Sequence, residues 1–371
     1  MSSPDLDKWL SQFPDAAQLP FKLRPRGLYT VAELYDKFDP AKPKSWESSY
    51  DYLSYLWFTE PDKDSSRKPR MLNIAEAIAA RLHDTEIGHS IDDFLRATGV
   101  RAVGFMGGHN TLRTDSAYTQ IAEMARTLRR AGLMIVTGGG PGLMEAANLG
   151  AFLAPYDDAQ LGSALSILKE APEAGNAKDP DGSFKWLKTA ATVRASLLGG
   201  NWRAPAKSGS ANLGIPTWLY GHEPPNLFST VIGKYFYNSV REDGLITVAS
   251  GGLVFGPGEA GTVQEVFQDT TLNFYRTDHA PTPMVFVGKD YWDPAKYDAS
   301  TPAPRDERRK PVFPLVQMLA KDHFESALLL SDDPSEIIAF LLKDGVKPKA
   351  APSARLAEAR LSRGSMEIRS A

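Results

Sequence analysis

The sequence predicts an α/β protein built on a doubly wound parallel sheet, with a helical extension in front of it. From residue 99 onward, short apolar runs alternate with segments of helical periodicity. Each of the first two runs, 99–108 and 133–142, ends in clustered glycines and is followed at once by a helical pattern. Strand, glycine turn and helix in succession are typical of the units that form parallel sheets.

Composition restricts the class of protein. The 371 residues are enough for one large domain with an accessory region, and 42% hydrophobic with 23% charged residues is typical of a soluble globular chain. A net charge of −3 gives no overall basic field, so we expect no nucleic acid partner. The absence of cysteine excludes thiolate metal sites and suits the cytoplasm, the expected location. No apolar run approaches the ~20 residues of a membrane helix, and the start resembles no signal peptide, so we expect no membrane partner.

The first region, residues 1–95, is expected to be an accessory helical region without a catalytic pattern. Its clearest helical segment is 71–84, where apolar side chains recur at intervals of three and four. These side chains are Met71, Ile74, Ala75, Ile78, Ala79 and Leu82. We therefore expect a helix here.

The main domain is expected over residues 96–346. Its first helices are expected at 115–132, where Asp115 suits the N-cap and Gly132 the stop, and at 143–154. Residues 155–210 then interrupt the alternation with long loop-like stretches around a short helix near 186–198. We interpret them as an insertion with the character of a lid, because loops of this length often serve a function.

The alternation resumes after the insertion and continues to the end of the main domain. Strands are expected at 211–221, 252–255, 282–288 and 327–332, and helices at 226–243, 261–275, 311–322 and 333–344. Asp333 and Pro334 suit the start of the last helix. The tail, 347–371, is basic and rich in alanine, proline and arginine, so we expect it to be mobile.

Three glycine clusters follow expected strands. They are Gly107 and Gly108, then Gly138, Gly139, Gly140 and Gly142, then Gly258 and Gly261. Glycine lets the backbone approach a ligand, and a helix that starts just after such a turn can bind phosphate. The structural alternative is that each cluster is only a tight turn. No GKS or GKT follows any of the clusters, so they form no P-loop, and residues 104–110, GFMGGHN, do not give a G-x-G-x-x-G pattern. The set therefore predicts a site for a mononucleotide or a sugar phosphate.

Thr262 and Glu265 stand near the start of the helix expected over 261–275. The helix N-terminus would stabilise the carboxylate, which would face the same crevice as the glycine clusters. The structural alternative is a capping box, because Thr262-x-x-Glu265 also satisfies backbone amides at a helix start.

Two segments resemble motifs of one family. Residues 256–265, GPGEAGTVQE, resemble the P-G-G-x-G-T-x-x-E motif of the lonely-guy (LOG) family of phosphoribohydrolases. Residues 137–151, TGGGPGLMEAANLGA, resemble its G-G-G-x-x-G-L-M motif, with a turn one residue shorter. The resemblance spans about residues 99–345. It implies a Rossmann-like homodimer that cleaves nucleoside 5′-monophosphates to free base and ribose 5-phosphate, without a metal or organic cofactor.

The resemblance also implies roles for single residues. Glu265 matches the final, catalytic glutamate of the motif, and Arg241 matches a catalytic arginine on the preceding helix. The glycine clusters, Met144 and Thr262 are implied to bind the substrate. Cleavage of a glycosidic bond passes through a ribosyl cation-like state, which a carboxylate beneath C1′ stabilises.

Besides the shorter turn and Leu245, which stands where methionine is usual, two positions depart from the family pattern, and two interpretations stay open. Glu259 replaces the second motif glycine, and Glu242 replaces the lysine that follows the arginine. Arg241 has a structural alternative, a surface ion pair with Glu242 or Asp243. The alternative function is a carrier or regulatory protein that binds a nucleotide or a phosphorylated cofactor on the same fold. Glu265 favours the enzyme, because a pure binder gains nothing from a carboxylate near the ribose.

Overall fold

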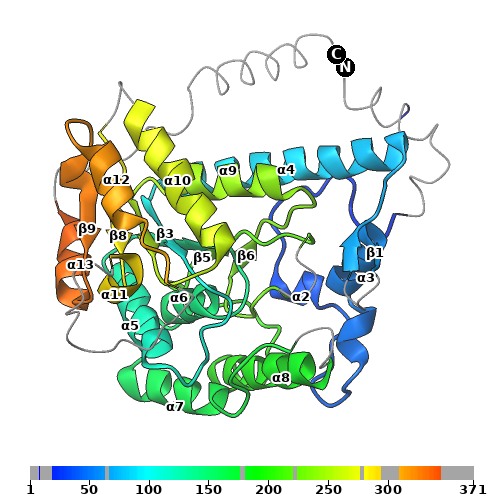
Figure 1. Ribbon diagram of the computed structural model, residues 1–371. Helices are drawn as coiled ribbons and strands as arrows, with labels where there is room; N and C mark the ends of the chain where they lie inside the picture. The colour runs from blue at the N-terminus through cyan, green and yellow to red at the C-terminus, as the bar shows by residue number, and fades with distance from the viewer. Residues whose placement is uncertain are drawn as a thin grey trace, which may run out of the picture.

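Seven strands form one parallel sheet in the order β6-β5-β4-β3-β7-β8-β9 (Figure 1). The computed structural model describes residues 8, 19–62, 67–175, 180–219, 224–275, 280–293 and 309–343. The predicted tail, 347–371, lies outside these residues. Helices flank the sheet, so the doubly wound α/β fold expected from the sequence is confirmed.

The strands are short, and those at the centre of the sheet are fully buried. They are β3 (Ala102–Met106), β4 (Met134–Thr137), β5 (Asn212–Gly214), β6 (Val231–Ile232), β7 (Gly252–Phe255), β8 (Met284–Phe286) and β9 (Leu328–Leu330). Runs such as MIVT in β4 and GLVF in β7 are continuous because helices cover both faces of a parallel sheet. A separate antiparallel pair joins β1 (Thr59–Pro61) to β2 (Arg67–Pro69).

The helices follow the expected alternation. They are α2 (Val31–Leu34), α3 (Tyr50–Phe58), α4 (Ile74–Thr98), α5 (Ser116–Arg130), α6 (Leu143–Phe152), α7 (Asp158–Leu168), α8 (Pro180–Leu197), α9 (Asn238–Val248), α10 (Ala260–Tyr275), α11 (Lys289–Trp292), α12 (Phe313–Ala320) and α13 (Pro334–Leu342). Asp115 is the N-cap residue of α5 as predicted, although its carboxylate accepts from Leu112 N rather than from the helix. Asp333 caps α13, with Pro334 in its first turn.

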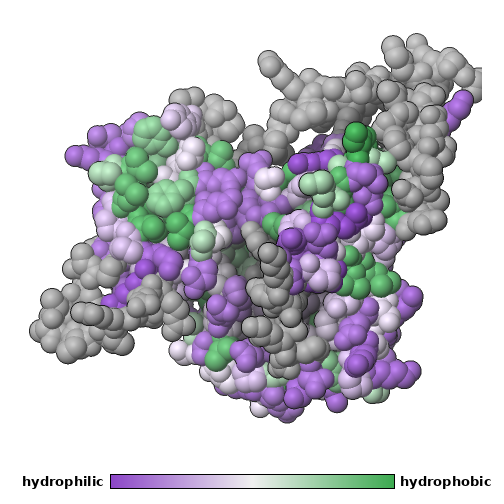
Figure 2. Space-filling view, turned by 45° about the vertical axis from the view of Figure 1, so that its right-hand side comes forward, coloured by the Kyte–Doolittle hydropathy of each residue, from purple (hydrophilic) through white to green (hydrophobic). Residues whose placement is uncertain are grey.

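Two layers of helices cover the sheet. α5 and α6 pack against each other on one face, with α13 beside α5. α9 and α10 lie on the other face, with α12 beside α10 (Figure 1). Among the described residues, no helix is both long and apolar enough to cross a bilayer. Apolar surface gathers over α10 and α12 (Figure 2), where Leu315 and Met318 are exposed.

Two expectations about secondary structure are wrong. The segment 155–210 is mainly helical: α7 and α8 pack against each other below α6 (Figure 1), where loops around one short helix were expected. The expected helix over 226–243 begins only at Asn238, because its first part contains β6. Valine and isoleucine in β6 favour a strand, and both pair with β5.

The N-terminal region covers the β6 edge of the sheet. Tyr29 and Ile232 exchange two backbone hydrogen bonds, of 2.9 and 2.8 Å, in an antiparallel bridge. Burying an edge strand in this way removes a site for unwanted pairing. Side chains from α2 and α4, including Leu34 and Ile87, belong to the same hydrophobic cluster as the sheet.

Candidate active site

The order of the strands places a crevice at one point along the sheet. The chain runs from β3 outward through β4, β5 and β6, and then returns to β7 on the other side of β3. The switch point therefore lies between β3 and β7, where Met106 is paired with Phe255. In open α/β sheets, ligands bind beyond the carboxyl ends of the strands at such a point.

The structure brings the three predicted glycine clusters together at this edge. The first two follow β3 and β4 directly, and the third lies between β7 and the first turn of α10, which contains Gly261. Their turns are also hydrogen-bonded to one another, because Gly108 N donates to Pro257 O at 2.8 Å and Leu143 N donates to Gly108 O at 3.2 Å. The three turns therefore form one continuous backbone surface.

Gly142 shows how tightly the second turn presses on the first. Its φ of 67° lies in the left-handed region, which favours glycine. A Cβ atom at this position would lie 2.5 Å from Gly108 O and 2.7 Å from His109 O. Because those neighbours are backbone atoms, only glycine fits here.

The third turn folds back on the start of α10. A Cβ atom on Gly258 would overlap the Thr262 hydroxyl and would lie 3.1 Å from Gly108 N. The hydroxyl and the amide therefore face the same small region. Gly261 is exposed, and a Cβ atom there would meet nothing within 4 Å in the described part of the chain. The N-terminus of α10 thus has room beside it for an anionic group.

The capping-box alternative for Thr262 does not hold. α10 begins at Ala260, and Val263 N donates to Glu259 O at 3.2 Å, so Glu259 is the residue that precedes the helix. Thr262 lies inside the first turn and is buried. Neither Thr262 nor Glu265 stands where a capping box requires it.

Arg241 and Glu265 meet across the interface between α9 and α10. Arg241 Nη1 lies 3.7 Å from Glu265 Oε1, and the two residues are only 5% and 7% exposed. The same Nη1 lies 3.7 Å from the position that a Cβ atom of Gly138 would take. The guanidinium group therefore joins the α10 carboxylate to the turn that follows β4.

Arg241 also has a partner on its own helix. Its Nη1 atom lies 3.2 Å from Glu242 Oε2 in a buried ion pair, whereas Asp243 accepts a hydrogen bond from Gln268. The ion pair between Arg241 and Glu242 that was the structural alternative is thus formed, but it is buried and not on the surface. Arg241 Nε and Glu242 Oε2 are buried and make no hydrogen bond to the described residues. Since buried polar atoms are normally hydrogen-bonded, the pair retains capacity to bind a ligand.

Met144 lies against the second turn. It is 9% exposed, and its Sδ atom lies 2.7 Å from the position of a Cβ atom on Gly138. The sulfur therefore occupies the space that a side chain at 138 would fill. Met144 thus packs against the second turn, beside which Arg241 also lies.

A buried amide network holds the second turn, and sequence reasoning missed it. Asn226 donates from its backbone to Gly139 O at 2.8 Å and from Nδ2 to Gly140 O at 3.0 Å. Asn148 Oδ1 accepts from Asn226 Nδ2 at 2.9 Å and from Thr137 Oγ1 at 2.7 Å. The available signal was the asparagine in α6, LMEAANLGAF, whose other residues apart from Glu145 are apolar or small.

A second buried network lies next to α6. Arg113 forms a bidentate ion pair with Glu145, at 2.8 and 2.5 Å, and donates to Thr189 Oγ1 on α8 at 2.7 Å. Tyr118 OH also donates to Glu145, at 3.1 Å. Because these side chains satisfy one another, we interpret the group as the structural link between α5, α6 and α8.

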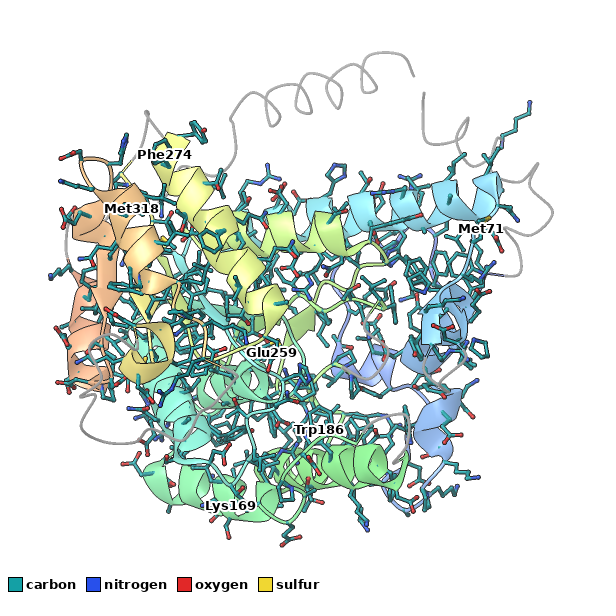
Figure 3. All side chains as sticks on the ribbon, viewed as in Figure 1. Met71, Lys169, Trp186, Glu259, Phe274 and Met318 are labelled. Carbon is teal, nitrogen blue, oxygen red and sulfur yellow. The ribbon has the colours of Figure 1, made fainter. Side chains whose placement is uncertain are left out.

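Glu259 stands at the rim of the third turn. Its side chain is 50% exposed, and Oε2 lies 3.7 Å from Lys310 Nζ. Figure 3 shows it at the foot of α10. Tyr291 OH donates to Gly258 O, the carbonyl just before it. The negative charge that the sequence placed beside the expected phosphate therefore has a cationic partner.

Neither the known protein-family models nor the curated proteins give a significant match to the chain. The site itself combines three kinds of group at the switch point: backbone turns beside helix N-termini, a hydroxyl, and a buried pair of Arg241 and Glu265. Such a set can bind a phosphate and stabilise a developing positive charge next to it.

Proposed function

We propose that this protein hydrolyses the N-glycosidic bond of nucleoside 5′-monophosphates. The observation that carries the proposal is the buried pair of Arg241 and Glu265, 3.7 Å apart, at the switch point between β3 and β7. The two side chains come from different helices, so the sequence spacing alone does not bring them together. Their position also agrees with the roles that the resemblance to the LOG family implies.

Each group has a role in the proposed reaction. The phosphate binds at the turn before α10, where the Thr262 hydroxyl and the helix N-terminus face it. The Glu265 carboxylate lies beneath C1′, stabilises the ribosyl cation-like state and orients a water molecule. The bond from C1′ to the base nitrogen breaks, water supplies the new hydroxyl at C1′, and the base leaves with a proton. Arg241 is permanently cationic and holds the phosphate or stabilises the departing base.

The proposal includes a cytoplasmic homodimer. The cysteine-free composition supports the location, and the resemblance implies the dimer. Exposed Leu315 and Met318 on α12 give apolar surface that suits contact with another chain.

The test is incubation with AMP, GMP, CMP, UMP and isopentenyl-adenosine monophosphate, followed by chromatography for free base and ribose 5-phosphate. We expect base release from at least one nucleotide, and a fall in kcat of about a hundredfold or more in Glu265→Gln. Asp243→Asn is the matched control, because this exposed carboxylate of α9 lies next to the pair but bonds to Gln268. Tight binding of a nucleotide without base release would instead support the carrier.

A further inference from the structure

One buried carboxylate outside the candidate site bonds to the start of α9. Asp84, on α4, is 1% exposed. Its Oδ1 atom accepts from Phe236 N, and its Oδ2 atom accepts from Tyr237 N, both at 2.9 Å. Each oxygen of one carboxylate therefore holds one of two consecutive backbone amides.

Those two amides immediately precede the helix that contains Arg241. Tyr237 is the N-cap residue of α9, and its own side chain makes no capping hydrogen bond. Arg241 N donates to Tyr237 O at 3.2 Å, so the arginine belongs to the first turn. A negative charge at a helix N-terminus is favourable, and Asp84 supplies it from another part of the chain.

The Asp84 carboxylate is itself held in place. His83 Nδ1 lies 3.1 Å from Asp84 Oδ1, and His83 Nε2 lies 3.0 Å from the Tyr29 hydroxyl. Tyr29 OH lies 2.8 Å from Tyr50 OH, which accepts from Lys22 N at 2.7 Å. This chain of hydrogen bonds runs through the region before the sheet and ends at α9.

The geometry points to Asp84 as a positioning residue for Arg241. By fixing the two amides before α9, it sets where the first turn lies, and hence where the guanidinium group meets Glu265 and the turn at Gly138. The inference rests on the proposed function. It means that the N-terminal region helps to position a side chain of the active site. Without this anchor the first turn of α9 frays, and Arg241 shifts relative to α10.

The experiment compares Asp84→Asn with wild type by hydrogen exchange and by kinetics. Asparagine keeps the shape but has one acceptor oxygen, so one amide loses its partner. We expect amides of 236–248 to exchange about tenfold faster. If Arg241 stabilises the departing base, we expect kcat to fall about tenfold with KM nearly unchanged; if it holds the phosphate, we expect KM to rise about tenfold with kcat nearly unchanged.

Tyr29→Phe and Tyr35→Phe form a matched pair for the same test. Each removes one buried hydroxyl from the N-terminal region, but Tyr29 bonds to His83 whereas Tyr35 bonds to Pro225 O at 2.8 Å. We expect Tyr29→Phe to raise exchange in α9 by roughly threefold and Tyr35→Phe to leave it unchanged. This pair keeps the test decisive if Asp84→Asn does not fold.

Uniform exchange changes across the chain, or unchanged exchange in α9, would overturn the inference. So would values of kcat and KM for Asp84→Asn that both equal those of wild type. If the wild type releases base from no nucleotide, the proposed function fails, while the exchange measurements still decide whether Asp84 anchors α9.

Discussion

Residue 259 shows how the turn differs from the glycine-rich motif it resembles without losing its shape. Glycine is required where the backbone adopts a positive φ. Glu259 does not adopt a positive φ, so the backbone of this turn does not require glycine there. The Glu259 carboxylate would instead repel a bound phosphate. Two like charges ~4 Å apart near a protein surface repel by roughly 4 kcal/mol. Pairing with Lys310 offsets that repulsion. The substitution therefore alters the charge of the rim and leaves the path of the turn intact.

Gly261→Ala should separate the requirements of the fold from those of the ligand. No described atom lies within 4 Å of the new methyl group, and alanine favours a helix more than glycine by up to about 1 kcal/mol. We expect equal or higher thermal stability. If a phosphate binds at this turn, the methyl group obstructs it, and nucleotide affinity falls about tenfold or more. Calorimetry and titration with the preferred nucleotide measure the two effects.

Gly162→Ala is the matched control for Gly261→Ala. Gly162 is exposed on α7 and also has no described neighbour within 4 Å of its Cβ position. The control should raise stability in the same way and leave nucleotide affinity unchanged. Equal affinity in both variants would contradict phosphate binding beside Gly261.

At the scale of the element, the segment before α9 shows tertiary pairing overriding a helical pattern. Residues 226–237 contain apolar spacing that predicted a helix, yet Val231 and Ile232 pair with β5 on one side. Ile232 also bonds to Tyr29 on the other side. These partners are distant in sequence, so no local pattern predicted the pairing. The late start of α9 places Arg241 in its first turn, close to the anchoring amides.

Gly150→Ala should disrupt the contact between α5 and α6. A Cβ atom on Gly150 would overlap the backbone carbonyl of Ala122, which cannot rotate away. We expect a loss of about 1–3 kcal/mol in the free energy of unfolding, or more, measured by urea denaturation. Gly162→Ala, which meets no neighbour, should not lose stability; equal midpoints for the two variants would show that the helices do not approach so closely.

The N-terminus of α4 should make stability depend on pH. Arg70 forms a bidentate ion pair with Glu76, at 2.6 and 3.1 Å, and this hydrogen bonding holds the pKa of Glu76 below its ordinary value of 4.5. A lowered folded-state pKa contributes stability that is fully present above pH 4.5 and is lost as the pH falls through the folded-state value.

Glu76→Gln tests this pH dependence. Glutamine can still form the capping box with Asn73, so the variant removes mainly the ion pair. We expect it to be less stable than wild type by about 0.5–1 kcal/mol at pH 7, and we expect this difference to shrink as the pH falls below 4.5. Denaturation across this pH range measures the difference, and a gap that does not change with pH would assign the effect to something other than the charge.

At the scale of the whole molecule, three regions of the sequence share one core. The hydrophobic cluster includes Phe38 from the N-terminal region, Val136 from the sheet, and Phe184 and Trp202 from the segment between α7 and β5. The ring centroids of Phe38 and Trp202 are 5.4 Å apart. Because each region buries side chains of the others, we expect them to unfold together.

Phe38→Ala should therefore lower the stability of the entire chain. Removing a buried phenylalanine costs about 3–5 kcal/mol. We expect a single thermal transition, shifted to lower temperature, when it is followed by both circular dichroism and tryptophan fluorescence. Met71→Ala is the control, because Met71 is 94% exposed and projects from the molecule (Figure 3). A separate early transition in Phe38→Ala would show that the N-terminal region unfolds alone.

Local patterns along the sequence specify much of this fold. Apolar runs and helical periodicity located six of the seven strands of the parallel sheet and most helices, but not β6, and turn chemistry located the glycine clusters with Thr262 and Glu265. These signals are local because side-chain spacing and backbone freedom act over a few residues.

Which of these elements contact one another depends on long-range packing. The strand order sets the switch point between β3 and β7, and the packing of α9 on α10 brings Arg241 to Glu265, 24 residues later in the chain. The same holds for the Asn148 network and for the reach of Asp84 across 152 residues to Phe236. Such contacts depend on the burial of whole faces and on register between distant segments, and short-range spacing does not encode them.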